Sequence, residues 1–143
     1  MPYGLWRIGG IGAALLASMV AAAEILPGDR RSGFDFMSPE TQRMQSDDSS
    51  NPGMLWVLEG ERLWSTPAGA SARACSGCHG DAVQSMRGVA TRYPAFDKQS
   101  GRPIDMAGRI NQCRVGQQQA EPLPRESDDL LAMTTYVGLQ SRG

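Results

Sequence analysis

The most reactive cluster in the sequence is Cys75-Ser76-Gly77-Cys78-His79. Two thiols at this spacing can form thioethers with the two vinyl groups of one haem, and the adjacent imidazole can then bind the iron. The motif therefore predicts one covalent haem c, attached through Cys75 and Cys78, with His79 as the first axial ligand.

Three other chemistries use the same residue types. Together with Cys113 the cluster could form a Cys3His zinc site, although the adjacent ligands Cys78 and His79 fit a tetrahedral site poorly. A thioredoxin-like redox pair expects a strand before the cysteines within a βαβ unit, whereas a helix and a loop are expected before Cys75. A plain Cys75–Cys78 disulfide would leave His79 at the surface. We favour haem attachment over these three.

The second axial ligand has to be chosen without another imidazole, because His79 is the only histidine of the chain. Methionine is the usual choice in cytochromes, but most of the methionines also suit a hydrophobic core. Cys113 is an unpaired thiol on the apolar face of an expected helix, and Arg109 and Arg114 could favour its thiolate. We therefore place Cys113 ahead of the other candidates, which are Lys98, Met37, Met44, Met54, Met86, Met106 and Met133.

Three helices are expected to position these side chains. The first begins at Asn51-Pro52, a cap followed by a first-position proline, and ends in the segment 65–69. The second runs from Asp105 to Arg114 and places Met106, Ile110 and Cys113 on one face. The third begins near Ser127, which provides its cap. Residues 94–103 and 116–124 are expected to be loops.

A helix before the cysteine pair and another at the C-terminus resemble the arrangement of class I cytochromes c. The resemblance implies a mostly α fold in which the two helices cross beside the haem. Gly60 with Trp64, against Tyr136 or Val137, is similar to that crossing.

The N-terminal residues 1–23 are expected to be a signal peptide. Arg7 precedes an apolar run over 8–20, and the segment 21–23 is a run of alanines suited to cleavage. A membrane anchor is the alternative, but the run is short and rich in Gly and Ala. Residues 24–50 are polar and lack periodicity, so we expect a long irregular arm before a haem domain at 51–143.

The formal net charge of −1 comes from scattered charges of both signs. A chain without a basic stripe has no electrostatic footprint for nucleic acid or for an anionic membrane surface. We therefore expect no nucleic-acid partner, and no membrane association after signal cleavage.

The chain also resembles SoxA, the larger subunit of the periplasmic SoxAX cytochromes of sulfur oxidation. The resemblance covers nearly everything after the signal, and its longest matching segments are 36–41, 51–57, 75–82, 86–97, 101–104, 109–114 and 140–143. It implies His79/Cys113 ligation, because Cys113 matches the distal cysteine of the family's Arg-Ile-Asn-x-Cys-Arg stretch. It also implies a periplasmic location, a SoxX-like partner, a SoxYZ-like carrier protein and thiosulfate as the substrate.

SoxA proteins contain two cytochrome-c-like halves, and the matching residues are those of the N-terminal half. In the family, the cysteine taken as catalytic lies in the other half, beside a second Cys-x-x-Cys-His. We therefore expect no catalytic residue within this sequence. Two other functions remain open, a stand-alone electron-transfer cytochrome and a binding module that does not load haem.

Overall fold

The computed structural model describes residues 25–142, so the expected signal peptide lies outside the described residues. The chain divides into two compact units, Met1–Met37 and Ser38–Gly143. The described part of the first unit consists of extended chain and two 3-10 turns, Pro27–Asp29 and Gly33–Phe36.

The second unit begins with a short helix that the sequence did not predict. Helix α1 (Pro39–Ser46) has proline at its first position, and the Ser38 side chain accepts a hydrogen bond from the Thr41 amide at 3.3 Å. None of its residues is buried. Within the expected irregular arm, residues 39–46 are thus helical.

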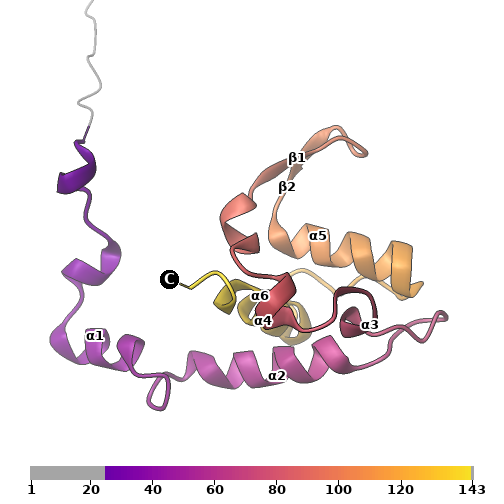
Figure 1. Ribbon diagram of the computed structural model, residues 1–143, viewed down its shortest axis with the longest axis horizontal. Coiled ribbons are helices and arrows are strands. Elements are labelled where there is room, and N and C mark those ends of the chain that lie inside the picture. The colour runs from indigo at the N-terminus through magenta and orange to yellow at the C-terminus, as the bar shows by residue number, and fades with distance from the viewer. Residues whose placement is uncertain (1–24, 143) are drawn as a thin grey trace, which may run out of the picture. The chain divides into compact units, whose positions relative to one another are not determined.

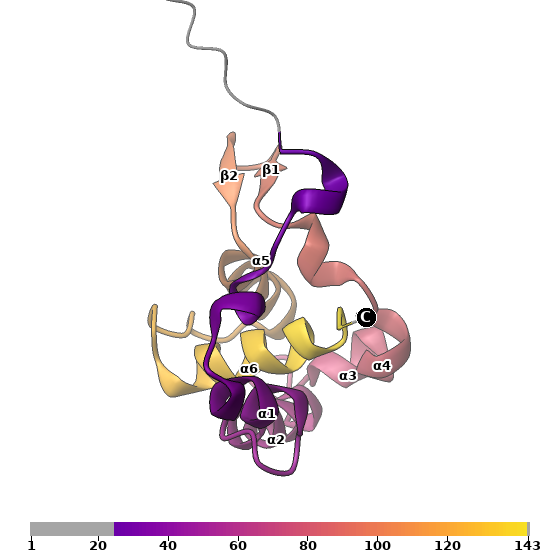
Figure 2. The same cartoon turned by 90° about the vertical axis from the view of Figure 1, so that its left-hand side faces the viewer.

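The three predicted helices are present, and each begins within two residues of its predicted start. In the first of them the cap position is taken by Pro52, not by Asn51 as predicted. Helix α2 (Gly53–Ser65) starts where the Asn51 side chain accepts from the Gly53 amide at 2.9 Å. Helix α5 (Met106–Cys113) is capped by Asp105 and helix α6 (Asp128–Leu139) by Ser127. In both Figure 1 and Figure 2, α6 lies between α2 and α5. The prediction of a mostly α fold is confirmed.

Helices α2 and α6 cross in close contact, as expected at Gly60. A Cβ atom at Gly60 would lie 2.2 Å from the Ala132 carbonyl oxygen and 2.5 Å from the Tyr136 Cβ. The crossing therefore requires a residue without a side chain. The buried core gathers around this contact and consists of Val57, Trp64, Ala82, Met133, Tyr136 and Val137.

The segment between the cysteine motif and α5 contains more regular structure than expected. Helix α3 (Cys75–His79) carries the motif, and helix α4 (Ala82–Ser85) and a 3-10 turn (Val89–Arg92) follow it. The prediction of a loop over 94–103 was wrong, because strands β1 (Ala95–Asp97) and β2 (Arg102–Ile104) form an antiparallel hairpin. The hairpin projects beyond α5 (Figures 1 and 2).

The segment after α5 also differs from the prediction. Residues Arg114–Gln118 form a π-helical turn, and Gln119 ends it in the left-handed conformation with a φ of 55°. The loop expected over 116–124 therefore begins only after residue 118. No helix within residues 25–142 combines the length and the apolar character needed to cross a membrane.

Candidate haem-binding site

A cavity of about 500 Å³ opens between α3 and α5. Its volume falls within the range of roughly 300–1,000 Å³ that is usual for cofactor sites. Most of its wall is apolar, and the apolar side chains include Leu63, Met86, Val89, Ile110, Met133 and Val137. A large flat apolar cofactor fits this lining.

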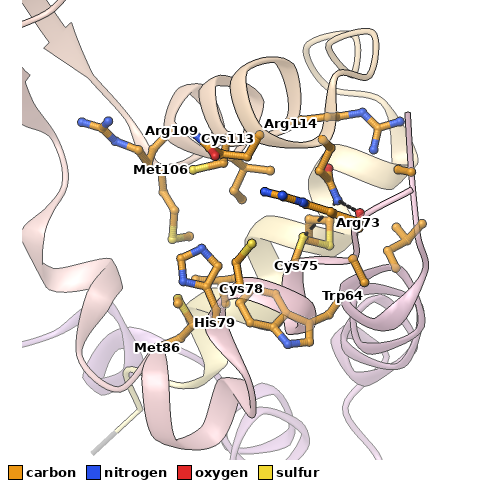
Figure 3. A pocket seen from close by; sticks show the side chains of 18 of the residues that line it. Trp64, Arg73, Cys75, Cys78, His79, Met86, Met106, Arg109, Cys113 and Arg114 are labelled. Carbon is orange, nitrogen blue, oxygen red and sulfur yellow. Dashed lines mark hydrogen bonds between the residues drawn. The ribbon is translucent and has the colours of Figure 1, made fainter. Parts of the chain in front are cut away.

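The cavity brings together all four residues that the sequence analysis placed at the haem. Cys75, Cys78 and His79 line it from α3, and Cys113 lines it from α5. Figure 3 shows Cys78 and His79 on one side of the cavity and Cys113 on the opposite side. The two groups are separated in the sequence but face the same space.

Three of the alternative axial ligands share this cavity. Met86, Met106 and Met133 line it, and Figure 3 shows Met106 on α5 beside Cys113. Met44, Met54 and Lys98 do not belong to its wall. Met37 is part of the other unit.

Trp64 anchors the cysteine motif to α2. Its indole N–H donates to the Gly80 carbonyl oxygen at 3.0 Å, and its ring centroid lies 5.7 Å from that of His79. The other neighbour of the indole is Tyr136, at 6.1 Å between ring centroids. The crossing of α2 and α6 therefore places the Trp64 ring beside His79.

The geometry does not favour a zinc site or a thioredoxin-like pair. Cys75, Cys78 and Cys113 are all free thiols, the form that thioether attachment of haem requires. Among residues 25–142, no group of three or more His, Cys, Asp or Glu side chains lies close enough to hold a metal ion. The same residues contain one sheet, the two-stranded antiparallel hairpin, and so they lack the βαβ unit of a thioredoxin-like site.

The charged side chains of the wall are mainly cationic. They are Arg73, Arg92, Arg109 and Arg114, with Asp129 as the one aspartate or glutamate that the described residues contribute. Haem carries two carboxylates on one edge of an otherwise apolar ring. Arginine side chains can pair with those carboxylates, so an apolar cavity lined by arginines suits haem better than it suits a neutral ligand. Burial raises the pKa of the Cys75 thiol, and the nearby Cys113 raises it further.

Asp97 supports the cavity wall from behind and was not predicted from the sequence. It is 5% exposed and binds Arg109 at 3.2 Å and the Gln112 side chain at 3.0 Å, so the hairpin is attached to α5. Hydrogen bonds from Ser100 and then from Gln112 lower the pKa of Asp97 to about 2. The contact joins the hairpin to α5, and no local sequence pattern indicates it.

The sequence was compared with known families, proteins and structures. Residues 59–143 match the family model described as SoxA/TsdA, cytochrome c domain. The chain belongs to the SoxA/TsdA cytochrome c family. This match confirms the resemblance to SoxA, and it makes covalently bound haem c the cofactor of the domain.

Several similar proteins are named as SoxA subunits. The L-cysteine S-thiosulfotransferase subunit SoxA of Pseudaminobacter salicylatoxidans is 37% identical over 90% of this chain and 45% of the relative. The subunit of that name from Rhodovulum sulfidophilum is 33% identical over 79% of this chain and 39% of the relative. The crystal structure of SoxXA from P. pantotrophus superposes with a TM-score of 0.72 at 30% identity, covering 78% of this chain and 42% of that one. The chain thus spans less than half the length of these relatives.

Proposed function

We propose that the domain holds one haem c through thioethers at Cys75 and Cys78, with His79 and Cys113 as the axial ligands of the iron. The observation that carries this proposal is that both α3 and α5 present sulfur or nitrogen donors to a single cavity. Cys113 is preferred over Met106 because it matches the distal cysteine of the family. Thiolate also stabilises ferric iron more than thioether does.

We further propose that the domain is the haem-bearing part of a SoxA-like subunit. Its relatives are named L-cysteine S-thiosulfotransferase subunits, and its structural neighbour is a SoxXA complex. The proposed complex with a SoxX-like cytochrome oxidatively couples thiosulfate to a cysteine of a SoxYZ-like carrier in the periplasm. Joining a thiol to thiosulfate releases one proton and two electrons. A haem would accept one electron at a time, so the coupling would need two acceptors, one of which the SoxX-like cytochrome would supply.

The residues of this domain contribute binding and positioning rather than sulfur transfer. A sulfur carrier needs a nucleophilic sulfur that both partners can reach. Cys75 and Cys78 are thioethers in the proposed holoprotein and cannot form a persulfide, and Cys113 is committed to the iron. We therefore assign no catalytic residue to the described residues.

The ligand assignment is tested by intact mass and spectroscopy. The holoprotein from a host that attaches haem should carry one haem that acid-acetone does not extract. Cys113→Ala should keep that haem but change the spectrum of the ferric form, while Met106→Ala, on the same helix, should leave the spectrum unchanged. The reverse pattern would make Met106 the ligand, and a haem-free product would refute the whole proposal.

The functional assignment is tested by turnover. The domain, a SoxX-like subunit, carrier protein and thiosulfate would be combined, with a full-length SoxA relative as the positive control. We expect turnover in the control alone. Comparable turnover with the domain would make Cys113 the catalytic sulfur. Fast electron exchange without any SoxX-like partner would instead favour a stand-alone electron-transfer cytochrome.

A further inference from the structure

Two segments far apart in the sequence are joined at the edge of the cavity. Residues 68–73 lead into Cys75, and residues 114–119 follow directly after Cys113. We refer to this pair of segments as the cavity bracket. Each segment is thus adjacent in the sequence to an element that carries one of the proposed haem-binding sulfurs.

Four hydrogen bonds join the two segments of the bracket. The Gln118 side-chain amide donates to the Arg73 carbonyl oxygen at 2.8 Å. The Ser71 hydroxyl donates to the Gln118 carbonyl oxygen at 2.8 Å, and the Ser71 amide donates to the same oxygen at 3.2 Å. The Ala70 amide donates to the Gln119 carbonyl oxygen at 3.1 Å. Gln118 takes part in three of these four bonds.

Gln118 is also the residue of the bracket closest to the haem-attachment motif. It is 7% exposed, and its side-chain nitrogen lies 3.9 Å from the Cys75 sulfur. A buried amide is costly unless it is hydrogen-bonded, so the bond to Arg73 determines where this side chain lies. Gln84 in α4, by contrast, is an exposed glutamine outside the cavity wall and makes no side-chain hydrogen bond within residues 25–142.

The backbone of the bracket is unusual on both sides. Gly69 has a φ of 64°, and a Cβ there would lie 2.2 Å from the Gln118 carbonyl oxygen. Ala72 and Gln119 have φ values of 50° and 55°, and the turn between Cys113 and Gln119 is π-helical. Non-glycine residues in the left-handed region and single π-turns occur preferentially at functional sites. Here they bring the two segments into contact.

We infer that Gln118 is a positioning residue that holds the Cys113 segment at a fixed distance from the Cys75 segment, and so keeps the Cys113 sulfur where it would bind the haem iron. This inference rests on the proposed ligation by His79 and Cys113. Without the bracket, α5 is attached to the remainder of the cavity wall mainly through its contact with α6 and through the hairpin. The Cys113 ligand would then give way more readily to a competing ligand.

The test is a titration of the ferric holoprotein with imidazole, which competes with Cys113 for the iron. Gln118→Leu keeps most of the bulk of the side chain but cannot donate to Arg73, and it adds no ligand for iron. We expect it to bind imidazole about tenfold more tightly than the wild type, as the loss of one buried hydrogen bond would give. Gln84→Leu, the same substitution at an exposed glutamine of α4 outside the cavity wall, should bind imidazole like the wild type. A Gln118→Leu variant that binds imidazole no more tightly than the wild type would overturn the inference.

Two further variants keep the result interpretable. If Gln118→Leu does not accumulate as holoprotein, Ser71→Ala removes one bond to Gln118 and should tighten imidazole binding by about two- to threefold. Wild-type affinity in Ser71→Ala would then overturn the inference. Cys113→Ala reports on the proposed ligation itself. If its spectrum equals that of the wild type, the ligation proposal and the inference both fail. A changed spectrum in Cys113→Ala together with wild-type imidazole affinity in Gln118→Leu refutes the inference alone.

Discussion

Replacing Gly60 by alanine tests the helix crossing on which the site is built. In an isolated helix this substitution should stabilise by about 0.8–1.0 kcal/mol, because alanine restricts the unfolded backbone. In this chain the new methyl would lie 2.2 Å from the Ala132 carbonyl oxygen, about 1.2 Å short of ordinary contact at 3.4 Å. That neighbour is backbone and cannot rotate away, so α2 and α6 must separate.

Separation of the helices outweighs the gain in helix propensity. Overpacking a core costs about 1–3 kcal/mol, and the severe contact with a backbone atom places this site at the upper end. We expect Gly60→Ala to lower the free energy of unfolding by about 2 kcal/mol after the propensity gain is subtracted. Since Trp64 lies one turn further along α2 and contacts His79, the visible spectrum of the haem should shift as well.

The assay is urea denaturation of the holoprotein, with Gly138→Ala as the matched control. Gly138 lies in α6, and a Cβ there would meet only the Met106 methyl group at an ordinary 3.7 Å. This control should be neutral or stabilised by up to about 1 kcal/mol. The two Gly→Ala changes should thus have opposite signs. A Gly60→Ala variant as stable as the wild type would refute the close crossing.

Three further predictions concern single side chains. Cys113→Met should raise the haem potential, since thioether favours ferrous iron more than thiolate does; a redox titration with an unchanged midpoint would exclude Cys113 as the ligand. The pKa of Asp97 is lowered from 3.8 to about 2 in the folded protein, so its ionised form stabilises the fold above pH 3.8 and this stabilisation is lost as the pH falls to about 2. The free energy of unfolding of the wild type should therefore fall between these two pH values, and that of Asp97→Asn should fall less. Trp64→Phe leaves the Gly80 carbonyl without its donor and should cost about 1–2 kcal/mol in denaturant unfolding; an unchanged midpoint would mean that water replaces the indole.

The helices that carry the site could be predicted because their signals are local. Asn51, Asp105 and Ser127 each provide a side-chain acceptor for the amides of a first helical turn, and apolar residues follow at helical spacing. The Gly60 crossing could be expected from the resemblance to class I cytochromes. These features depend on neighbouring residues or on a known arrangement.

The elements that were missed lack such signals. Strands of three residues, as at Ala95–Asp97, are too short to show an alternating pattern, and Pro103 in the partner strand argued against pairing. Helix α1 is polar all round, so only its Ser38 cap and the proline after it could have revealed it. The π-turn that contains Gln118 is stabilised by residues 68–73, and that contact cannot be read from the local sequence.

Only Cys75, Cys78 and His79 could be assigned from spacing alone. From the sequence alone, both Cys113 and several methionines are candidates for the second axial ligand. The structure places three of those methionines on the same cavity wall as Cys113. Composition does not separate these donors, because thiol and thioether side chains both occupy apolar surroundings. The choice rests on family resemblance and on the experiments above.

The crossing of α2 and α6 also has a consequence for access to the cavity. Gly60 and Ala132 are 72 residues apart in the sequence, so their contact closes a long loop that contains the entire haem motif. Closing such a loop costs entropy, which is recovered only once its two ends pack together. Met133 and Val137 of α6 belong both to the buried core and to the cavity wall. Any separation of α6 from α2 therefore loosens the core and opens the cavity at the same time.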